Sequence, residues 1–282
     1  MKLITWNIQW CRGVDGRVDP RRIVEHARAL ADFDVLCLQE VAANFPSLAG
    51  SSGENPFEAL AQLLPDYVAI HGAAVDTPAP DGARRTFGNM ILSRLPVGRV
   101  LRIQLPWPAD PGSKGMARML LDAVIETALG PMRVMTTHLE YYSAVQRAAQ
   151  VEAIRGRHAE ACAHARAASL RDDSGGPFQS FEQPASAILT ADFNYRPDDP
   201  LHLRMQAPFD DGALQFVDAW QQAHPGVPHV PTLGVHDREQ WPQAYASDFV
   251  YVTEDLVPRL RAVKVDGETQ ASDHQPVLVE LA

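Results

Sequence analysis

Short apolar runs of strand length recur along the chain and predict the strands of an α/β protein. Some runs alternate apolar with polar positions, which is typical of half-buried strands, and others are continuous, which is typical of strands buried on both faces. The expected strands are Leu3–Ile8, Val35–Leu38, Met90–Leu92, Val97–Ile103, Met119–Ile125, Met132–Thr136, Ala187–Leu189, Phe249–Val252 and Val277–Leu281.

Helix signals lie between these runs. Asp19-Pro20 and Asn55-Pro56 each place a capping side chain before a proline, a pattern that favours the first turn of a helix. We expect the second of these helices to continue through Leu64, and a long alanine-rich helix to begin after Ser143 and reach about Ala168. Because strands and helices do not alternate one by one, the pattern favours an α/β sandwich of two packed sheets.

Three long segments are loops by composition. Residues 104–117 are rich in Pro and Gly, residues 171–186 are polar with Gly and Pro, and residues 221–246 are rich in Pro and His. Loops of this length in a compact domain are often functional. Segment 171–186 resembles a linker, but the strands on both sides of it carry the candidate site described below. We therefore expect a single domain over residues 1–282.

Polar residues recur where these strands begin or end. They are Asn7, Glu40, Asn89, His138, Asp192, Asn194, Asp248, Asp273 and His274. Some of them follow a strand and others precede one. If neighbouring strands run antiparallel, the entry of one strand meets the exit of the next on the same side of the molecule. We therefore expect these side chains to converge at one edge of the sandwich.

These residue types suit the cleavage of a phosphate ester. A phosphodiester is already anionic, so attack by water requires neutralisation of charge. Glu40 and Asp273 supply hard oxygen ligands, and Asn7 adds a neutral carbonyl oxygen. Such a set suits Mg²⁺, which binds a few protein oxygens and keeps several waters.

The remaining polar residues suggest roles in the chemistry. We expect Asp192 to orient or deprotonate the attacking water, and Asn194 to donate a hydrogen bond to the phosphorus centre. Asp248 is expected to hold His274 in one tautomer and to favour its protonated form. A cationic His274 would stabilise the non-bridging oxygens, whereas a neutral one would act as general base, and the residues alone leave both roles open.

Charge and composition restrict the classes of protein that fit. The formal net charge of −10 disfavours a module that binds duplex nucleic acid through a broad basic face, but it is compatible with an enzyme that recruits a cation. The apolar runs are all shorter than the roughly 18 residues that span a bilayer, and a strand-like segment from residue 3 leaves no room for a signal peptide. We therefore expect no membrane insertion and a cytoplasmic location.

Cysteines and loop histidines do not show the spacing of a metal site. The three cysteines are widely separated, and a disulfide framework is not expected; they are Cys11, Cys37 and Cys162. Three histidines of the third loop match no zinc-binding pattern, and we interpret them as incidental; they are His224, His229 and His236.

Seven stretches together resemble the endonuclease/exonuclease/phosphatase superfamily of metal-dependent phosphoesterases. They are TWNIQ, LQE, GNMILSRLP, TTHLEYYS, ADFN, SDFVYV and SDHQPV, in the order of the family and spanning residues 3–279. The resemblance implies a four-layer α/β sandwich, in which two mixed sheets pack face to face with helices outside. It also implies Mg²⁺ or Mn²⁺ as cofactor and in-line attack of water on phosphorus.

The resemblance also implies roles for individual residues. Glu40 matches the principal metal ligand, with Asn7 and Asp273 nearby, and His138 resembles the histidine that contacts the scissile phosphate or assists the leaving group. Arg118 resembles a phosphate-contacting arginine of some branches. The other matched residues are Asp192, Asn194, Asp248 and His274 at catalytic positions, and Asn89, which either contacts the phosphate or braces its loop.

The THL motif is similar to that of the branch containing pancreatic-type deoxyribonuclease, neutral sphingomyelinase, deadenylases and tyrosyl-DNA phosphodiesterases. Two departures leave the subfamily open: Ala191 stands where glycine is frequent, and SDFVYV lacks the arginine that often precedes Asp248. Aromatic residues in the expected loops either stack on a base or lipid-like group or simply pack; they are Trp10, Trp107, Tyr141, Tyr142 and Trp241.

Our hypothesis is a divalent-metal-dependent phosphoesterase that hydrolyses a phosphodiester of nucleic acid or nucleotide. The first alternative is a phosphatase or phosphodiesterase for a small-molecule or lipid-headgroup phosphate, of the inositol phosphate or sphingomyelin type, because no lysine-rich groove is evident. The second is an inactive scaffold, against which the complete polar set counts. The sequence names no protein partner.

Overall fold

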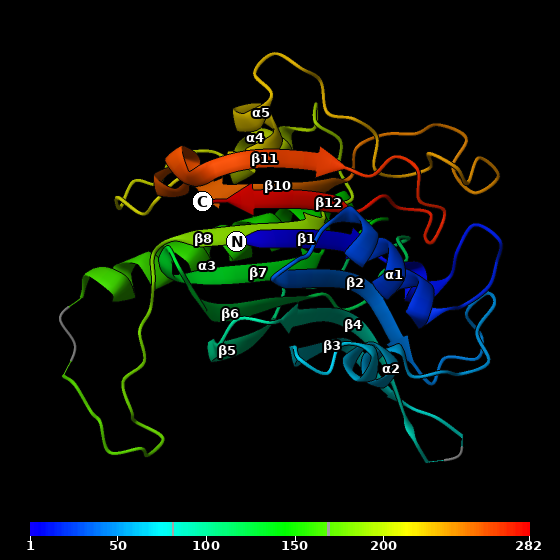
Figure 1. Cartoon of the computed structure of the whole chain (residues 1–282), viewed down its shortest axis with the longest axis horizontal. Coiled ribbons are helices and arrows are strands. Elements are labelled where there is room, and N and C mark those ends of the chain that lie inside the picture. The colour runs from blue at the N-terminus through cyan, green and yellow to red at the C-terminus, as the bar shows by residue number, and fades with distance from the viewer. Residues whose placement is uncertain (81, 168–169) are drawn as a thin grey trace.

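The computed structural model describes residues 1–80, 82–167 and 170–282 and consists of two six-stranded mixed sheets packed face to face (Figure 1). The first sheet has the strand order β11-β12-β1-β2-β4-β3, and the second has the order β5-β6-β7-β8-β10-β9. With helices on the outer faces, this arrangement confirms the four-layer α/β sandwich expected from the sequence.

The strands of each sheet come from separate parts of the chain. The first sheet contains β1 (Lys2–Asn7), β2 (Val35–Ala43), β3 (Val68–Pro78), β4 (Arg84–Ser93), β11 (Leu260–Val265) and β12 (Val277–Leu281). The second contains β5 (Val97–Gln104), β6 (Met119–Thr127), β7 (Gly130–His138), β8 (Ala187–Asp192), β9 (Phe216–Asp218) and β10 (Asp248–Thr253). The terminal strands β1 and β12 pair antiparallel, so the two ends of the chain meet in one sheet (Figure 1).

Three apolar layers hold the sandwich together, and strand alternation explains them. Successive side chains of a strand point to opposite faces. In β1, Leu3 therefore packs between the two sheets, whereas Ile4 and Trp6 pack under the outer helices of the first sheet. In β8, Ile188 faces the layer between the sheets and Leu189 faces the outer helices of the second. The continuous apolar runs in the sequence are thus strands buried on both faces.

The structure contains five α-helices in the described ranges, and the three that the sequence predicted begin where their capping signals lie. The five are α1 (Pro20–Leu30), α2 (Pro56–Leu63), α3 (Ala144–Arg166), α4 (Pro200–Met205) and α5 (Ala219–Ala223). The side chains of Asp19, Asn55 and Ser143 accept backbone hydrogen bonds at the first turns of α1, α2 and α3. The predicted end of the third helix at about Ala168 lies outside the described residues. None of the helices within the described ranges is long and apolar enough to cross a membrane.

The sequence did not predict every element. The three strands it missed, β3, β9 and β11, all lie at sheet edges. An edge strand buries less of its surface, so its apolar pattern is weak, as the mostly exposed or half-buried residues of β11 show. The short helices α4 and α5 were also missed because they contain only six and five residues.

Strand register brings the candidate residues to one end of the sandwich. β7 and β8 are parallel, and His138 pairs with Asp192. β8 and β10 are antiparallel, and Asp248 pairs with the same Asp192. The exits of β7 and β8 therefore meet the entry of β10, which is the convergence expected from the sequence.

Asp218 fastens the long loop after α5 to the body of the protein. Its Oδ1 caps α5 by accepting hydrogen bonds from the backbone of residues 220 and 221. Its Oδ2 accepts from Nε2 of His202 at 2.7 Å and from Nε2 of His229 at 2.8 Å. Of the three loop histidines, only His229 joins this cluster, because His224 and His236 bond separately to backbone carbonyl groups.

The loop held in this way supports the candidate site directly. Thr232, three residues beyond His229, donates its hydroxyl to Oδ2 of Asp248 at 2.6 Å. The same hydroxyl oxygen accepts the backbone N–H groups of Ser247 and Asp248, each at 3.1 Å. Asp218 and Asp248 are therefore linked through one segment of the chain.

We expect Asp218→Asn to lower the free energy of unfolding by about 2 kcal/mol at pH 7. Burial raises the pKa of the Asp218 carboxyl, but hydrogen bonds from His202 and His229 outweigh burial and lower that pKa from 3.8 to about 2. A group with a lowered folded-state pKa stabilises the fold above its unfolded pKa and loses that contribution as the pH falls. The wild type should therefore lose stability between pH 4 and pH 2, whereas the variant should lose less, as measured by urea unfolding across this range.

Asp199→Asn is the matched control, because Asp199 caps α4 through its Oδ1 and its side chain bonds to the backbone of Leu201. Asparagine is also a good capping residue, so this change should leave stability nearly unaltered. Equal losses in the two variants would show that capping, and not the contact with the histidines, explains the effect.

Candidate active site

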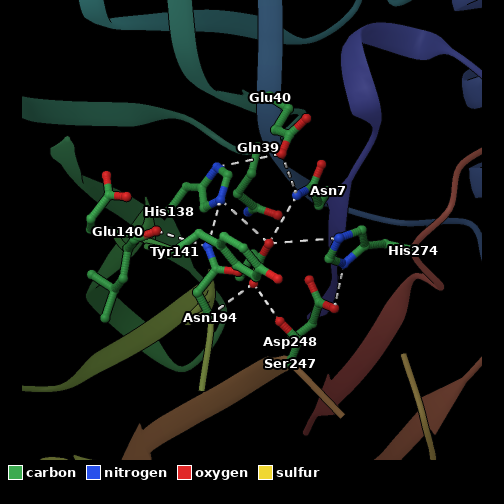
Figure 2. Close-up of polar contacts among 12 residues, drawn as sticks. Asn7, Gln39, Glu40, His138, Glu140, Tyr141, Asn194, Ser247, Asp248 and His274 are labelled. Atoms are coloured by element: carbon green, nitrogen blue, oxygen red, sulfur yellow. Dashed lines mark hydrogen bonds and ion pairs between the residues drawn. The ribbon is translucent and has the colours of Figure 1, made fainter. Parts of the chain in front are cut away.

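A cavity of about 240 Å³ opens where the two sheets meet. Among the polar residues predicted from the sequence, those that line it are Glu40, Arg118, His138, Asp192, Asn194, Asp273 and His274. Asn7 and Asp248 lie next to these residues and bond to them, as Figure 2 shows. Asn89 lies beside a smaller adjoining recess, where its Nδ2 donates to the carbonyl of Met119 at 3.1 Å.

Glu40 projects into the cavity from a distorted strand. The pairing of β2 with β4 shifts register between Leu38 and Val41, and Glu40 has a φ of 58°, which is uncommon for a residue other than glycine. Backbone strain of this kind is concentrated at functional sites. Burial and the charge of Asp273 raise the pKa of the Glu40 carboxyl from 4.5 to about 7. A nearby cation would offset the repulsion between the negative charges of Glu40 and Asp273, so Glu40 is suited to act as a metal ligand.

Asn7 connects the two sheets at the floor of the site. Its Nδ2 donates to Oε1 of Glu40 at 3.2 Å and to Oδ2 of Asp192 at 3.0 Å. Its carbonyl Oδ1 accepts the backbone N–H of Gln9 at 3.1 Å. The sequence suggested Asn7 as an oxygen ligand, but in the structure the amide donates to the carboxylates and its oxygen is engaged elsewhere.

Asp192 is held by donors on both of its carboxylate oxygens. Oδ1 accepts the backbone N–H of Asn194 at 3.0 Å and the hydroxyl of Ser247 at 2.5 Å. Oδ2, which is bonded to Asn7, lies 3.4 Å from Nε2 of His138 and 3.7 Å from Nε2 of His274. Burial raises the pKa of Asp192, but the charge of His274 and the hydrogen bonds hold it below its ordinary value. Asp192 is therefore a fixed carboxylate.

Sequence reasoning missed Ser247, although its position gives a signal. Ser247 directly precedes Asp248 at the start of β10. Its side chain is fully buried and its hydroxyl supplies the donor to Asp192. A small neutral donor thus stands at this position.

Asn194 and His138 form a second fixed pair. Nδ2 of Asn194 donates to Nε2 of His138 at 2.9 Å and to the carbonyl of Leu139 at 2.8 Å. Both amide hydrogens are then used, so Asn194 holds His138 in place; the sequence had suggested a direct hydrogen bond to phosphorus oxygens. Burial, followed by the charge of Arg118, lowers the pKa of His138 from 6.5 to about 3. With Nε2 accepting, neutral His138 carries its proton on Nδ1.

His274 is held by Asp248 in one orientation. Its Nδ1 lies 2.8 Å from Oδ2 of Asp248, and its backbone carbonyl accepts the indole N–H of Trp6 at 2.9 Å. Burial lowers the pKa of His274, but the carboxylates of Asp248 and Asp192 outweigh burial and raise it well above 6.5. His274 is thus an imidazolium whose Nδ1 faces Asp248 (Figure 2) and whose Nε2 lies 3.7 Å from Oδ2 of Asp192.

Arg118 and Asp273 complete the lining of the cavity. Nε of Arg118 donates to Oε2 of Glu140 at 3.2 Å, whereas its buried Nη1 has no hydrogen-bond partner within residues 1–80, 82–167 and 170–282. Buried donors are normally paired, so this atom is suited to an anionic ligand. Oδ2 of Asp273 accepts the side-chain N–H groups of Gln9 at 2.9 Å and Trp241 at 3.0 Å.

The balance of charge fits a divalent cation. Three carboxylates, those of Glu40, Asp192 and Asp273, line the cavity together with the imidazolium of His274 and with Arg118, which is paired to Glu140. Buried carboxylates need compensating positive charge, and hard oxygen donors prefer Mg²⁺ or Mn²⁺ over softer metals. The donor set therefore fits the cofactor that the sequence suggested.

Comparisons with known proteins agree with this geometry. A structure described as an endonuclease/exonuclease/phosphatase from Beutenbergia cavernae is 26% identical and covers 100% of this chain and 72% of its own, with a TM-score of 0.70. The mannosyl-6-phosphatase of Bacteroides thetaiotaomicron is 15% identical over 100% of this chain and 99% of its own (TM-score 0.67). A humanized TDP2 of D. rerio is 16% identical over 100% and 98% (TM-score 0.61).

The last two likenesses are below 25% identity and show the fold alone. No curated protein sequence matches the chain. The family model described as "Endonuclease/Exonuclease/phosphatase family" matches residues 4–274, nearly the whole chain. The chain therefore belongs to the endonuclease/exonuclease/phosphatase family, whose members are phosphoesterases.

Proposed function

We propose that this protein is a Mg²⁺- or Mn²⁺-dependent phosphodiesterase acting on nucleic acid or a nucleotide. The observation that carries the proposal is the environment of Asp192: a fixed carboxylate with an imidazolium on one side and a neutral imidazole on the other. Phosphoryl transfer to water needs a group that orients the water and donors that meet the charge of the phosphate. This cavity contains both.

Glu40 and Asp273 would hold the metal ion. A divalent cation held there would neutralise the charge of the phosphate and make the attacking water easier to deprotonate. Asn7 keeps Glu40 and Asp192 at a fixed separation through its two N–H bonds. It is a positioning residue in this scheme.

Asp192, and not His274, is the better acceptor for the proton of the attacking water. His274 is held as an imidazolium by Asp248 and Asp192 and so has no free lone pair with which to act as a base. Its Nε2–H is instead suited to bind the non-bridging phosphate oxygens. His138, neutral with a proton on Nδ1, donates a hydrogen bond to the phosphate or to the leaving oxygen.

A small-molecule or lipid-headgroup ester is the second candidate substrate. Arg118 is the one Lys or Arg side chain among the residues that line the described cavity, and the net charge of the chain is −10. Several aromatic side chains also line it, among them Tyr141, Tyr142 and Trp241. A compact ester with one flat or apolar group fits this lining better than a long duplex does.

The cavity takes residues from Gln9 to His274, so we also propose that residues 1–282 act as one domain. The cytoplasmic location stays a prediction. The geometry counts against the inactive-scaffold alternative. The expected polar residues lie together, and the pairs Asn194–His138 and Asp248–His274 are hydrogen-bonded.

The protonation of His274 can be measured without substrate. In metal-free protein, ¹⁵N NMR of the imidazole should show a cationic His274 through pH 7. Asp248→Asn removes the negative charge that bonds to Nδ1, so the pKa of His274 should fall and the neutral form should appear at a lower pH. A neutral His274 in the wild type at pH 6 would contradict the proposed assignment of acid and base.

Activity is the direct test of the proposed function. The protein with Mg²⁺ or Mn²⁺ would be tested on single- and double-stranded DNA, RNA, dinucleotides, an aryl phosphodiester, and inositol and choline phosphoesters. Asp192→Asn and His274→Ala should each lower the rate by at least about 10²-fold, the scale of a general acid–base or charge-stabilising group. His164→Ala, an exposed histidine on α3, serves as the control and should retain the wild-type rate.

Wild-type rates in both Asp192→Asn and His274→Ala would end this assignment of the site. Faster cleavage of the small esters than of the polymers would favour the second candidate substrate. If every ester stays intact with either metal present, the inactive-scaffold alternative replaces both proposed substrate classes.

A further inference from the structure

Asp273 is bound by an unusual number of donors on one oxygen. Its Oδ2 accepts Nε2 of Gln9 at 2.9 Å, Nε1 of Trp241 at 3.0 Å and Nε2 of Gln240 at 3.4 Å. Gln9 belongs to the 3₁₀ turn Gln9–Cys11 after β1, whereas the other two residues belong to the loop after α5. Two segments far apart in the sequence thus converge on one carboxylate oxygen.

The two oxygens of Asp273 are consequently not equivalent. Three N–H donors use up the lone pairs of Oδ2, so this oxygen has little capacity left for a cation. The donor near Oδ1 is the hydroxyl of Ser272 at 3.2 Å, which lies closer to the carbonyl of Asn7, at 2.8 Å. Among the described residues, Oδ1 therefore has fewer donors than Oδ2 and more capacity left for a cation.

Trp241 is itself held rigidly over Asp273. Its backbone N–H bonds to the carbonyl of Asp237 at 3.1 Å, which closes a local turn. Gly234 lies directly against it: the φ of Gly234 is +67°, and a Cβ there would stand 2.5 Å from Cβ of Trp241. The N–H of Gly234 also donates to the backbone carbonyl of Asp273 at 3.1 Å. The loop and the Asp273 segment are thus fastened together through main chain and side chain.

The indole ring of Trp241 has a second contact at the cavity. It lies edge-on to Tyr141, with ring centroids 5.9 Å apart at an interplanar angle of 78°. Both rings line the cavity. The packing surface of Trp241 and its hydrogen-bonding Nε1 are therefore directed at different neighbours, and a substitution that keeps the ring but removes the N–H separates the two effects.

We propose that Trp241 is a positioning residue of the metal site, whose indole N–H fixes the Asp273 carboxylate so that Oδ1 serves as the metal ligand. The proposal rests on the metal-dependent function proposed above. Groups that orient a metal ligand from behind typically contribute 10- to 100-fold to metal affinity. Trp241 acts through Asp273 and needs no contact with the cation or the phosphate.

The test is the affinity for Mn²⁺, measured by electron paramagnetic resonance on metal-stripped protein without substrate. Trp241→Phe keeps an aromatic ring beside Tyr141 but removes the donor, and it should weaken Mn²⁺ binding by about 10-fold. Gln240→Ala should weaken it less, because that donor lies farther from the oxygen, at 3.4 Å. Urea unfolding of each metal-free variant identifies any loss of affinity that arises from a damaged fold.

Trp10→Phe is the matched control for the loss of an indole N–H. Trp10 lines the same cavity, but its Nε1 donates to the carbonyl of Ala49 at 2.9 Å and not to Asp273. Its Mn²⁺ affinity should stay within about twofold of the wild type, since Trp10 lacks the bond to the ligand.

Three results would overturn the inference. Unchanged Mn²⁺ affinity in Trp241→Phe, with normal binding by the wild type, rejects the role of Trp241 and leaves the proposed function standing. Equal weakening in Trp241→Phe and Trp10→Phe shows that the effect is not specific to the bond with Asp273. A wild type that fails to bind Mn²⁺ at all rejects the metal-dependent function itself.

Discussion

Asp192 accepts hydrogen bonds from both halves of the sandwich, and the candidate site depends on this junction. Asn7 donates to it from β1 in the first sheet, and Ser247 donates from the residue before β10 in the second. Other polar contacts also join the sheets, such as those of Gln39 with Thr136 and of Asn89 with Met119. Most of the remaining interface is apolar packing, which is not directional. A fixed polar junction between them sets the distance between Glu40 on the first sheet and His138 on the second. Chemistry shared across two sheets requires such a constraint.

The same junction determines which groups carry charge. Burial disfavours every ionised side chain, so each charged group here persists only because a specific partner compensates it. His274 stays cationic between Asp248 and Asp192, whereas His138, bonded to the neutral amide of Asn194 and near Arg118, stays neutral. Two histidines in one cavity thus take opposite protonation states. This difference in charge agrees with the separate roles proposed above, in which the cation binds phosphate oxygens and the neutral ring donates a hydrogen bond.

Much of this arrangement could be predicted from the sequence, for a physical reason. Strands buried on both faces leave continuous apolar runs, and a polar residue at the end of such a run is conspicuous, as with Glu40 and Asp192. The direction of each amide could not be predicted. Asn7 and Asn194 were expected to offer an oxygen to metal and an N–H to phosphate, but both amides are directed at neighbouring side chains. Contacts that join distant segments, such as His202 with His229 through Asp218, leave no local pattern.

The long loop after α5 shows why such distant contacts matter for function. Its composition predicted only a loop with several histidines and prolines. In the structure its side chains bond to three buried carboxylates: His229 to Asp218, Thr232 to Asp248, and Trp241 to Asp273. Two of these carboxylates, those of Asp248 and Asp273, belong to the candidate site. Ordering a loop of this length costs conformational entropy, and several buried hydrogen bonds are needed to offset that cost. The same loop therefore holds both Asp248 and Asp273, so a substitution that frees the loop would disturb both carboxylates, and with Asp248 the orientation of His274.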